Sequence, residues 1–331
     1  MAIIMAIESS CDETAIAILK DKKELLANVV SSQIETHQLY GGVVPEIASR
    51  MHIQNISYVL KEALTKANLT MDQIDAIAVT RGPGLVGSLH IGMQCAKTLV
   101  LAYHKPLIGV HHIAGHIYAN QLVSEMKFPL LTLVVSGGHT ELVYMKDHLD
   151  FEVIGSTLDD AIGEAYDKVG RVIEVSYPGG PEIDRLAKLG KPSYSLPKPK
   201  DDDSFDFSFS GLKSAVINLV HKYHQRNEEI DKADLACSFQ NVALGVLVEK
   251  TIKAAKYYNV KQVMIAGGVS ANSKLREDLT KACQDHHLDL VLPPLWCCTD
   301  NAAMIAMAGS FMYDLKEFSS LDLGVKPNIE L

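Results

Sequence analysis

One pattern occurs twice along the chain, and it constrains the fold more than any other feature of the sequence. Near the start, the apolar run 3–7, a polar turn and a second apolar run 15–19 follow one another. The same order returns with the run 130–135, a polar turn and the run 142–145. Short apolar runs separated by polar turns are typical of antiparallel strands. The sequence therefore predicts an internal duplication in which each half opens on a hairpin.

The two turns also share residue types. Ser10 and Thr14 stand four apart in the first turn, as do Ser136 and Thr140 in the second. Further apolar runs predict strands, and stretches of helical spacing predict helices between them. The expected strands are 25–30, 74–79, 107–110, 260–266 and 288–292, and the expected helices are 45–66, 88–103, 212–222, 233–258, 273–285 and 301–313. Alternation of this kind indicates an α/β fold, and a length of 331 residues suggests about two domains.

Composition excludes several classes of protein. Hydrophobic residues make up 47% and charged residues 21% of the chain, as in ordinary globular proteins. No apolar run approaches the ~18–20 residues of a membrane helix. The six cysteines lack Cys-x-x-Cys spacing, which favours a reduced, cytoplasmic location. The formal net charge of −9 predicts that the chain alone binds nucleic acid weakly and with strong salt dependence.

A pair of histidines indicates a metal site. His112 and His116 stand four apart, so in a helix both would project from one face, within reach of one ion. A metallopeptidase would carry Glu after the first histidine, whereas this chain has Ile113, which disfavours that class. Asp300 has the right chemistry for a third ligand. Its position before the expected helix 301–313 is equally typical of a helix N-cap.

Three glycine turns follow expected strands or loops, at 136–139, 177–181 and 266–272. Glycine lets backbone N–H groups approach phosphate oxygens, and a following helix N-terminus adds a favourable dipole. The turns therefore predict a nucleotide site. Neither a Gly-x-Gly-x-x-Gly fingerprint nor a Walker A lysine motif is present, which lowers the Rossmann and P-loop interpretations.

Acidic residues form a third group of candidates. Asp160, Glu164 and Asp167 follow i, i+4, i+7 spacing and are expected to line one helix face, where a cation or a ligand could offset their repulsion. Asp184 follows the Pro-Gly-Gly-Pro turn and could hold a substrate hydroxyl. Residues 191–209 are rich in Pro, Ser, Lys and Asp, and predict an exposed excursion.

Ten motifs together resemble a known family. They occupy, in order, residues 8–14, 41–50, 82–87, 111–116, 135–140, 163–168, 177–181, 206–213, 266–272 and 298–301. The chain is similar over nearly its whole length to the bacterial TsaD family, the tRNA N6-adenosine threonylcarbamoyltransferases, once misnamed O-sialoglycoprotein endopeptidases.

The resemblance implies an α/β fold of two ribonuclease H-like lobes, as in the actin/sugar-kinase/heat-shock-chaperone superfamily, around a nucleotide cleft. The expected lobes are 1–125, with a segment from about 305 to 331 packing back on it, and 126–304. The implied reaction transfers a threonylcarbamoyl group from L-threonylcarbamoyl-AMP to N6 of adenosine 37 in tRNAs that read ANN codons, and releases AMP.

The resemblance also implies roles for residues. His112, His116 and Asp300 would bind one divalent metal, Fe²⁺ or Zn²⁺. Substrate would contact Val135, Ser136, Gly137, Gly138, His139, Asp167, Gly180, Asp184 and Asn272. Asp12 and Glu13 match acids at the family's active centre, and Glu13 could accept the proton from N6. The implied partners are tRNA, a paralogous TsaB-like subunit, a TsaE-like ATPase and the enzyme that makes the adenylate.

Three other functions compete with this expectation. An ATPase or small-molecule kinase of the same fold would leave the histidine pair without a role. A non-catalytic nucleotide-binding scaffold would tolerate loss of the metal ligands. A metallopeptidase would need the missing glutamate.

Overall fold

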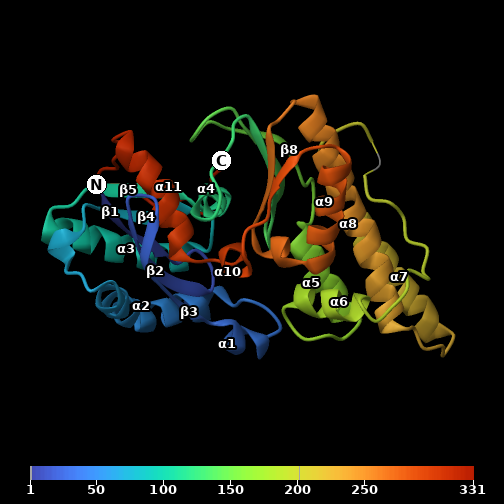
Figure 1. Cartoon of the computed structure of the whole chain (residues 1–331). Helices are drawn as coiled ribbons and strands as arrows, with labels where there is room; N and C mark the ends of the chain where they lie inside the picture. Colours follow the sequence, from blue (N-terminus) through green and yellow to red (C-terminus); the bar gives the residue numbers. More distant parts are fainter. Residues whose placement is uncertain (1, 201) are drawn as a thin grey trace. The chain divides into compact units, whose positions relative to one another are not determined.

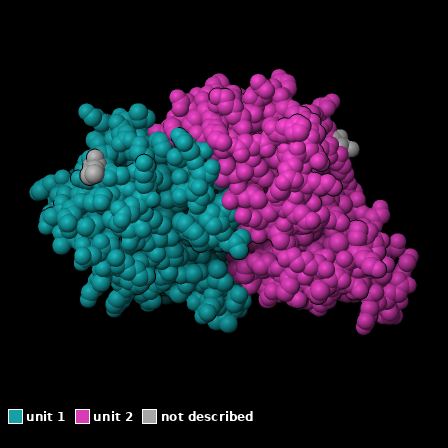
Figure 2. Space-filling model, in the orientation of Figure 1, with its two compact units in different colours: residues 1–125, 293–331 teal, residues 126–292 magenta. Residues whose placement is uncertain are grey.

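The computed structural model describes residues 2–200 and 202–331. The chain divides into two compact units, residues 1–125 with 293–331 and residues 126–292 (Figure 2). The return to the first unit begins at Pro293, earlier than the expected residue 305. The reason is that the short helix α10 (Leu295–Cys298) contacts the 3₁₀ turn η2 (Ala119–Leu122) of the first unit.

The first unit contains a five-stranded mixed sheet of order β3-β2-β1-β4-β5 (Figure 1). Strand β1 pairs antiparallel with β2, which pairs antiparallel with β3, while β4 and β5 continue the sheet parallel to β1. The strand bounds are β1 Ile3–Glu8, β2 Glu13–Lys20, β3 Glu24–Ser32, β4 Ala76–Gly82 and β5 Leu107–His111.

The second unit repeats this topology. Its sheet has the order β10-β9-β6-β7-β8, again with an antiparallel meander of three strands followed by two parallel strands. The bounds are β6 Leu130–Val135, β7 Thr140–Met145, β8 Phe151–Ser156, β9 Gln262–Ala266 and β10 Asp289–Val291. The predicted α/β fold and duplication are confirmed. Strand β8 was not expected, because it is only partly buried and lacks an apolar run.

Helices cover both faces of the first sheet. Side chains of α2 (Pro45–Ala67) and α3 (Val86–Tyr103) share a core with Met5 and Ile77. Helix α11 (Ala302–Asp314) lies on the opposite face, where a Cβ atom at Gly309 would meet the Ala78 side chain at 2.7 Å. Adjacent strand residues face opposite sides of a sheet, so the two helix layers are separated by the strands. The remaining elements are α1 (Ile34–Gln38), η1 (Met71–Gln73) and α4 (His112–Tyr118).

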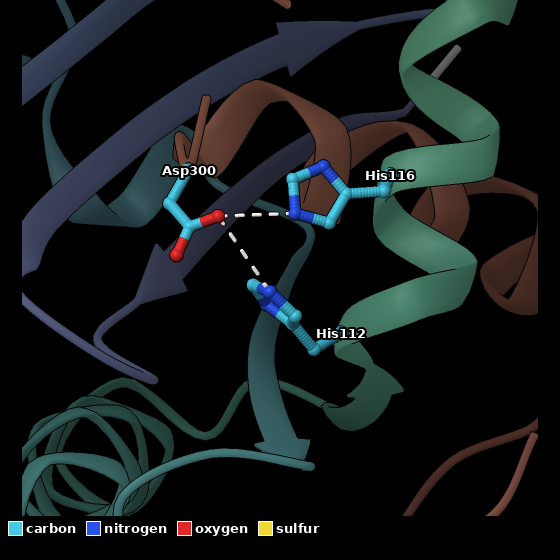
Figure 3. A group of neighbouring side chains, drawn as sticks. All are labelled: His112, His116 and Asp300. Carbon is cyan, nitrogen blue, oxygen red and sulfur yellow. Dashed lines mark hydrogen bonds and ion pairs between the residues drawn. The ribbon is translucent and has the colours of Figure 1, made fainter. Parts of the chain in front are cut away.

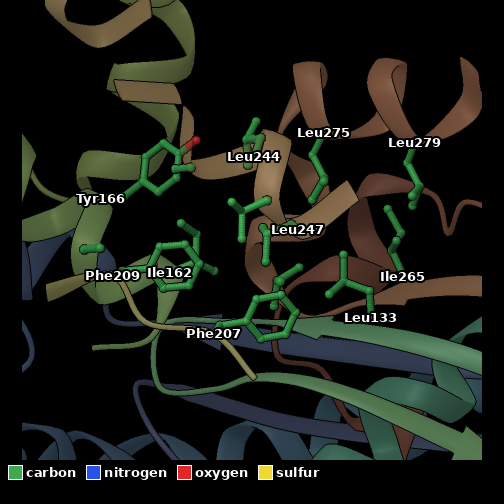
Figure 4. Packing of buried hydrophobic residues seen from close by; sticks show 14 of the residues in the cluster. Leu133, Ile162, Tyr166, Phe207, Phe209, Leu244, Leu247, Ile265, Leu275 and Leu279 are labelled. Carbon is green, nitrogen blue, oxygen red and sulfur yellow. The ribbon is translucent and has the colours of Figure 1, made fainter. Parts of the chain in front are cut away.

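The second unit is built around one apolar core on the long helix α8 (Lys232–Tyr257) (Figure 4). Leu244 and Leu247 of α8 belong to the same cluster as Leu133 and Ile265 of the sheet. The other elements are α5 (Ile162–Val172), α6 (Gly179–Ala187), α7 (Ser210–Gln225), η3 (Gly268–Ala271) and α9 (Ser273–Asp285). Among the described helices, none is long and apolar enough to cross a membrane.

The expected exposed excursion is wrong at its end. Phe207 and Phe209 are fully buried in the core of the second unit, and the backbone at Phe207 bridges to Thr157. The prediction of exposure followed the polar composition of the segment and overlooked these two rings. Burial of each large aromatic ring contributes more free energy to folding than is lost by ordering the polar residues around it.

Candidate functional site

The two histidines lie together at the end of β5 in the first unit. Helix α4 begins at His112, and His111 caps it by accepting a hydrogen bond from the Ile113 N–H. His112 and His116 are one turn apart, so both rings face the same side. Asp300 lies in the loop between α10 and α11. Its Oδ1 is 3.0 Å from Nε2 of His116 and 3.6 Å from Nε2 of His112 (Figure 3).

This group fits a divalent transition metal. One potential ligand atom from each residue lies within 4.8 Å of the others. Two imidazoles and a carboxylate suit zinc or iron, and three protein ligands leave a coordination position for a reacting molecule. The helix-cap alternative for Asp300 is wrong, because Asn301 caps α11 by accepting from the Met304 N–H. The Asp300 carboxylate is therefore not used for capping.

A buried acid stands behind His112. Oε2 of Glu8 lies 3.2 Å from Nδ1 of His112, and the Glu8 side chain is fully buried. Thr80 Oγ1 and the Ser10 N–H donate to the same carboxylate. A carboxylate on the far nitrogen of a metal-binding imidazole fixes its tautomer and orientation. Glu8 was not predicted to take part, although a carboxylate ending a buried apolar strand always needs a partner.

The same charges set the protonation of His112. Burial lowers the pKa of the imidazole, but the Asp300 and Glu8 carboxylates outweigh burial and raise it to about 9. Without a metal, His112 is therefore protonated at neutral pH. Nε2 must lose its proton before it can donate a lone pair to a metal ion.

The expected catalytic acids lie in the first unit at the start of β2. Asp12 and Glu13 are both mostly buried, and Glu13 Oε1 accepts a hydrogen bond from Ser32 Oγ. Burial, together with the charges of Asp300 and Asp12, raises the pKa of Glu13 well above its usual value. A raised pKa makes a carboxylate a stronger base. Proton acceptance by Glu13 stays a prediction.

In the second unit, the first glycine turn joins β6 to β7. Val135 ends β6 and is fully buried, whereas Gly137 and Gly138 are exposed. Ser136 Oγ accepts from the His139 N–H, which closes the turn. The start of α5 lies against it, since a Cβ at Gly163 would stand 2.5 Å from the Ser136 carbonyl oxygen. Glycine at 163 is thus required by this close approach.

The remaining expected substrate residues lie on neighbouring helices of the second unit. Asp167 on α5 accepts from the Gly179 N–H at 2.7 Å, next to Gly180 in the first turn of α6. Asp184, further along α6, accepts from Ser273 Oγ. Asn272 caps α9 through the Leu275 N–H. Of these residues, Gly180 lies at the N-terminus of α6 and Asn272 at that of α9, and helix N-termini favour anions.

The expected acidic helix face is wrong. Helix α5 begins at Ile162, so Asp160 precedes it. Asp160 pairs with Lys168 and Lys213 instead, and Lys168 also pairs with Glu164. Lys168 and Lys213 therefore offset the charges of Asp160 and Glu164, whereas Asp167 accepts from the Gly179 N–H.

Comparison with known proteins agrees with the geometry. Residues 24–307 match the TsaD family, described as tRNA N6-adenosine threonylcarbamoyltransferase. A protein of that name from Bacillus anthracis is 60% identical over 99% of this chain and 96% of its own length. One of the same name from Staphylococcus carnosus is 56% identical over 99% and 96%.

Solved structures of other proteins share the fold. A crystal structure of HypF in its phosphate- and nucleotide-bound form superposes with a TM-score of 0.64 at 13% identity, covering 97% of this chain and 47% of that one. An activator of 2-hydroxyisocaproyl-CoA dehydratase from Clostridium difficile gives a TM-score of 0.52 at 15% identity, covering 96% and 98%. At these identities the likeness shows the fold alone. The match over most of the chain and the near-full-length relatives show that the chain belongs to the tRNA N6-adenosine threonylcarbamoyltransferase family.

Proposed function

We propose that this protein transfers the threonylcarbamoyl group of L-threonylcarbamoyl-AMP to N6 of adenosine 37 in tRNAs that read ANN codons, with release of AMP. The observation that supports this most strongly is the His112, His116 and Asp300 group in a chain of this family. A transferase of this family acts on tRNA, so we place the reaction in the cytoplasm, where tRNAs are used.

His112, His116 and Asp300 would hold the metal, for which we propose Fe²⁺ or Zn²⁺. When bound, such an ion supplies Lewis-acid polarisation of an oxygen on the mixed anhydride. Glu8 keeps Nδ1 of His112 engaged, so that Nε2 points to Asp300. The two histidines enter from one helix turn, and Asp300 enters from a loop fixed by the Asn301 cap.

The turn 135–139, together with Asp167, Gly180, Asp184 and Asn272, would hold the adenylate. Backbone N–H groups at the starts of α6 and α9 suit the phosphate. N6 of adenine is a weak nucleophile, so positioning should provide much of the rate. Glu13 would accept its proton, and Asp12 would keep the pKa of Glu13 raised.

Partners follow from family membership alone. We propose that a TsaB-like subunit and a TsaE-like ATPase assist this chain, and that a separate enzyme supplies the adenylate. The net charge of −9 leaves little general attraction for tRNA. A basic patch lent by a partner would therefore strengthen tRNA binding.

The proposal is tested by transfer of labelled threonylcarbamoyl from the adenylate to an unmodified ANN-decoding tRNA, with the partner proteins present. His112→Ala should abolish transfer, whereas His90→Ala, an exposed histidine on α3, should retain it. Glu13→Gln should retain AMP binding and lose transfer. Absence of transfer by the unaltered protein would overturn the proposal, and ATP-dependent phosphorylation of a small acceptor would favour the kinase alternative.

A further inference from the structure

Helix α8 carries a buried amide, Gln240, among apolar neighbours. Gln240 is 2% exposed, and its neighbours Phe239, Ala243 and Leu244 are fully buried members of the core. Burying an amide costs free energy unless its donors and acceptor are paired. An apolar residue would fill the same space without that cost, so the amide needs another explanation.

Among the described residues, two of the three side-chain hydrogen bonds of Gln240 connect it to expected substrate residues. Its Nε2 donates to Asp184 Oδ1 at 3.2 Å. Its Oε1 accepts from Asn272 Nδ2 at 2.9 Å and from the Tyr166 hydroxyl at 3.2 Å. An ionised carboxylate only accepts, so Nε2 must face Asp184, and Oε1 must then face the two donors. The amide can adopt only this orientation.

The orientation of Gln240 fixes two further side chains. Asn272 gives its Nδ2 to Gln240, while its Oδ1 accepts from the Leu275 N–H at 3.0 Å and caps α9. The Asn272 amide is therefore held at both ends. Asp184 is held by Gln240, by Ser273 Oγ at 2.9–3.0 Å, and by an ion pair with Lys188 at 3.2 Å.

Tyr166 supports this network from the core. Its ring is 1% exposed and packs edge-on against Phe239, with ring centroids 5.1 Å apart. Tyr166 precedes Asp167, the acid that accepts from the Gly179 N–H. One amide thus links α5, α6 and α9, each of which supplies an expected substrate residue.

We propose that Gln240 is a positioning residue that sets the orientation of Asp184 and Asn272 toward the adenylate. The inference rests on the proposed function, because it assumes that those two side chains contact the nucleotide. Gln240 is buried beneath them and acts through them. Its loss should weaken nucleotide binding more than it slows the transfer step.

The test measures AMP binding to the whole chain by calorimetry and the KM and kcat of transfer in the complete assay. Gln240→Met removes the amide at similar length, and Tyr166→Phe removes only one donor. Thr251→Val is the control, since Thr251 is a buried polar residue of the same helix whose hydroxyl donates to the Leu247 carbonyl and, among the described residues, contacts none of the expected substrate residues. Thermal unfolding of every variant is recorded in parallel.

We expect Gln240→Met to raise the Kd for AMP about tenfold, which corresponds to about 1.4 kcal/mol. KM for the adenylate should rise to a similar extent, with kcat changing less than about twofold. Tyr166→Phe should raise Kd by about two- to threefold, and Thr251→Val should leave it unchanged. If Gln240→Met does not fold, the Kd of Tyr166→Phe for AMP decides: a two- to threefold rise supports the proposal, and an unchanged Kd overturns it.

The proposal is overturned if folded Gln240→Met binds AMP as tightly as the unaltered protein does, whatever its thermal stability. A fall in kcat with unchanged KM would overturn it as well. Failure of the proposed function has a different signature, because the unaltered protein would then transfer no threonylcarbamoyl group to tRNA, whether or not it binds AMP.

Discussion

Replacement of Glu8 by Gln tests whether the residues behind the histidines control metal affinity. Glu8 is fully buried, and its carboxylate contacts Nδ1 of His112 at 3.2 Å. The change keeps the size and removes the charge, but it replaces one carboxylate oxygen by an NH₂ group, whereas the Thr80 hydroxyl and the Ser10 N–H donate to different oxygens. One of these two donors therefore loses its acceptor, and His112 loses the negative charge beside its Nδ1.

The expected magnitude follows from that contact. Loss of the partner on the far nitrogen of a ligating imidazole typically lowers metal affinity by about 10- to 100-fold, or about 1.4–2.8 kcal/mol. The fold itself should persist, because no cavity is created and the loss of one buried hydrogen-bond acceptor costs only about 1–3 kcal/mol. The effect should appear as a weaker dissociation constant for Zn²⁺, measured by competition with a chromogenic chelator.

Asp75→Asn is the matched control for this experiment. Asp75 accepts from the Ile3 N–H at the opposite end of β1, so its replacement perturbs the same strand away from the histidines. The reasoning would be refuted if Glu8→Gln and Asp75→Asn changed Zn²⁺ affinity equally. A normal Zn²⁺ affinity for folded Glu8→Gln would refute it as well.

Three further predictions concern the second unit. Gly163→Ala should cost about 1–3 kcal/mol in urea unfolding, because the new Cβ would stand 2.5 Å from the Ser136 carbonyl oxygen, whereas Gly245→Ala, which points into open space, should cost nothing; equal costs would contradict this. Phe207→Ala should cost about 3–5 kcal/mol, since the ring is fully buried, and a loss below about 1 kcal/mol would show that the core repacks. Burial raises the pKa of Asp160, but hydrogen bonds and charges from Lys168 and Lys213 outweigh burial and lower this pKa below its usual 3.8. A lowered pKa stabilises the folded protein above the unfolded pKa, and this stabilisation is lost as the pH falls. The unaltered protein should therefore be more stable than Asp160→Asn by about 1 kcal/mol at pH 7, and the difference should shrink below pH 3.8; a difference that grows in acid would contradict the ion pairs.

Local patterns predicted much of the secondary structure. Helix periodicity predicted α2, α3, α8, α9 and α11, and apolar runs predicted nine of the ten strands named above. Strand β8 was not predicted, because a strand that is only partly buried has no apolar run in its sequence. The spacing of the acidic residues predicted a helix face wrongly, because helix α5 begins after Asp160. The charge of Asp160 is paired with Lys213, which lies far along the chain.

Part of the candidate site could likewise be predicted from the sequence, and part could not. Four-residue spacing was enough to pair His112 with His116, because a helix turn brings such residues together by itself. The same spacing could not choose between a ligand and a cap for Asp300. That choice required knowing that Asn301 already caps α11.

The sequence by itself determined the duplicated α/β architecture, the histidine pair and the family, because each is recorded in residues that are neighbours along the chain. The tertiary structure decided which distant groups meet: Asp300 with the histidines, Glu8 behind His112, and Gln240 beneath Asp184 and Asn272. These contacts join separate elements across a packed core, and only the burial of apolar surface around them brings their polar atoms within hydrogen-bonding distance.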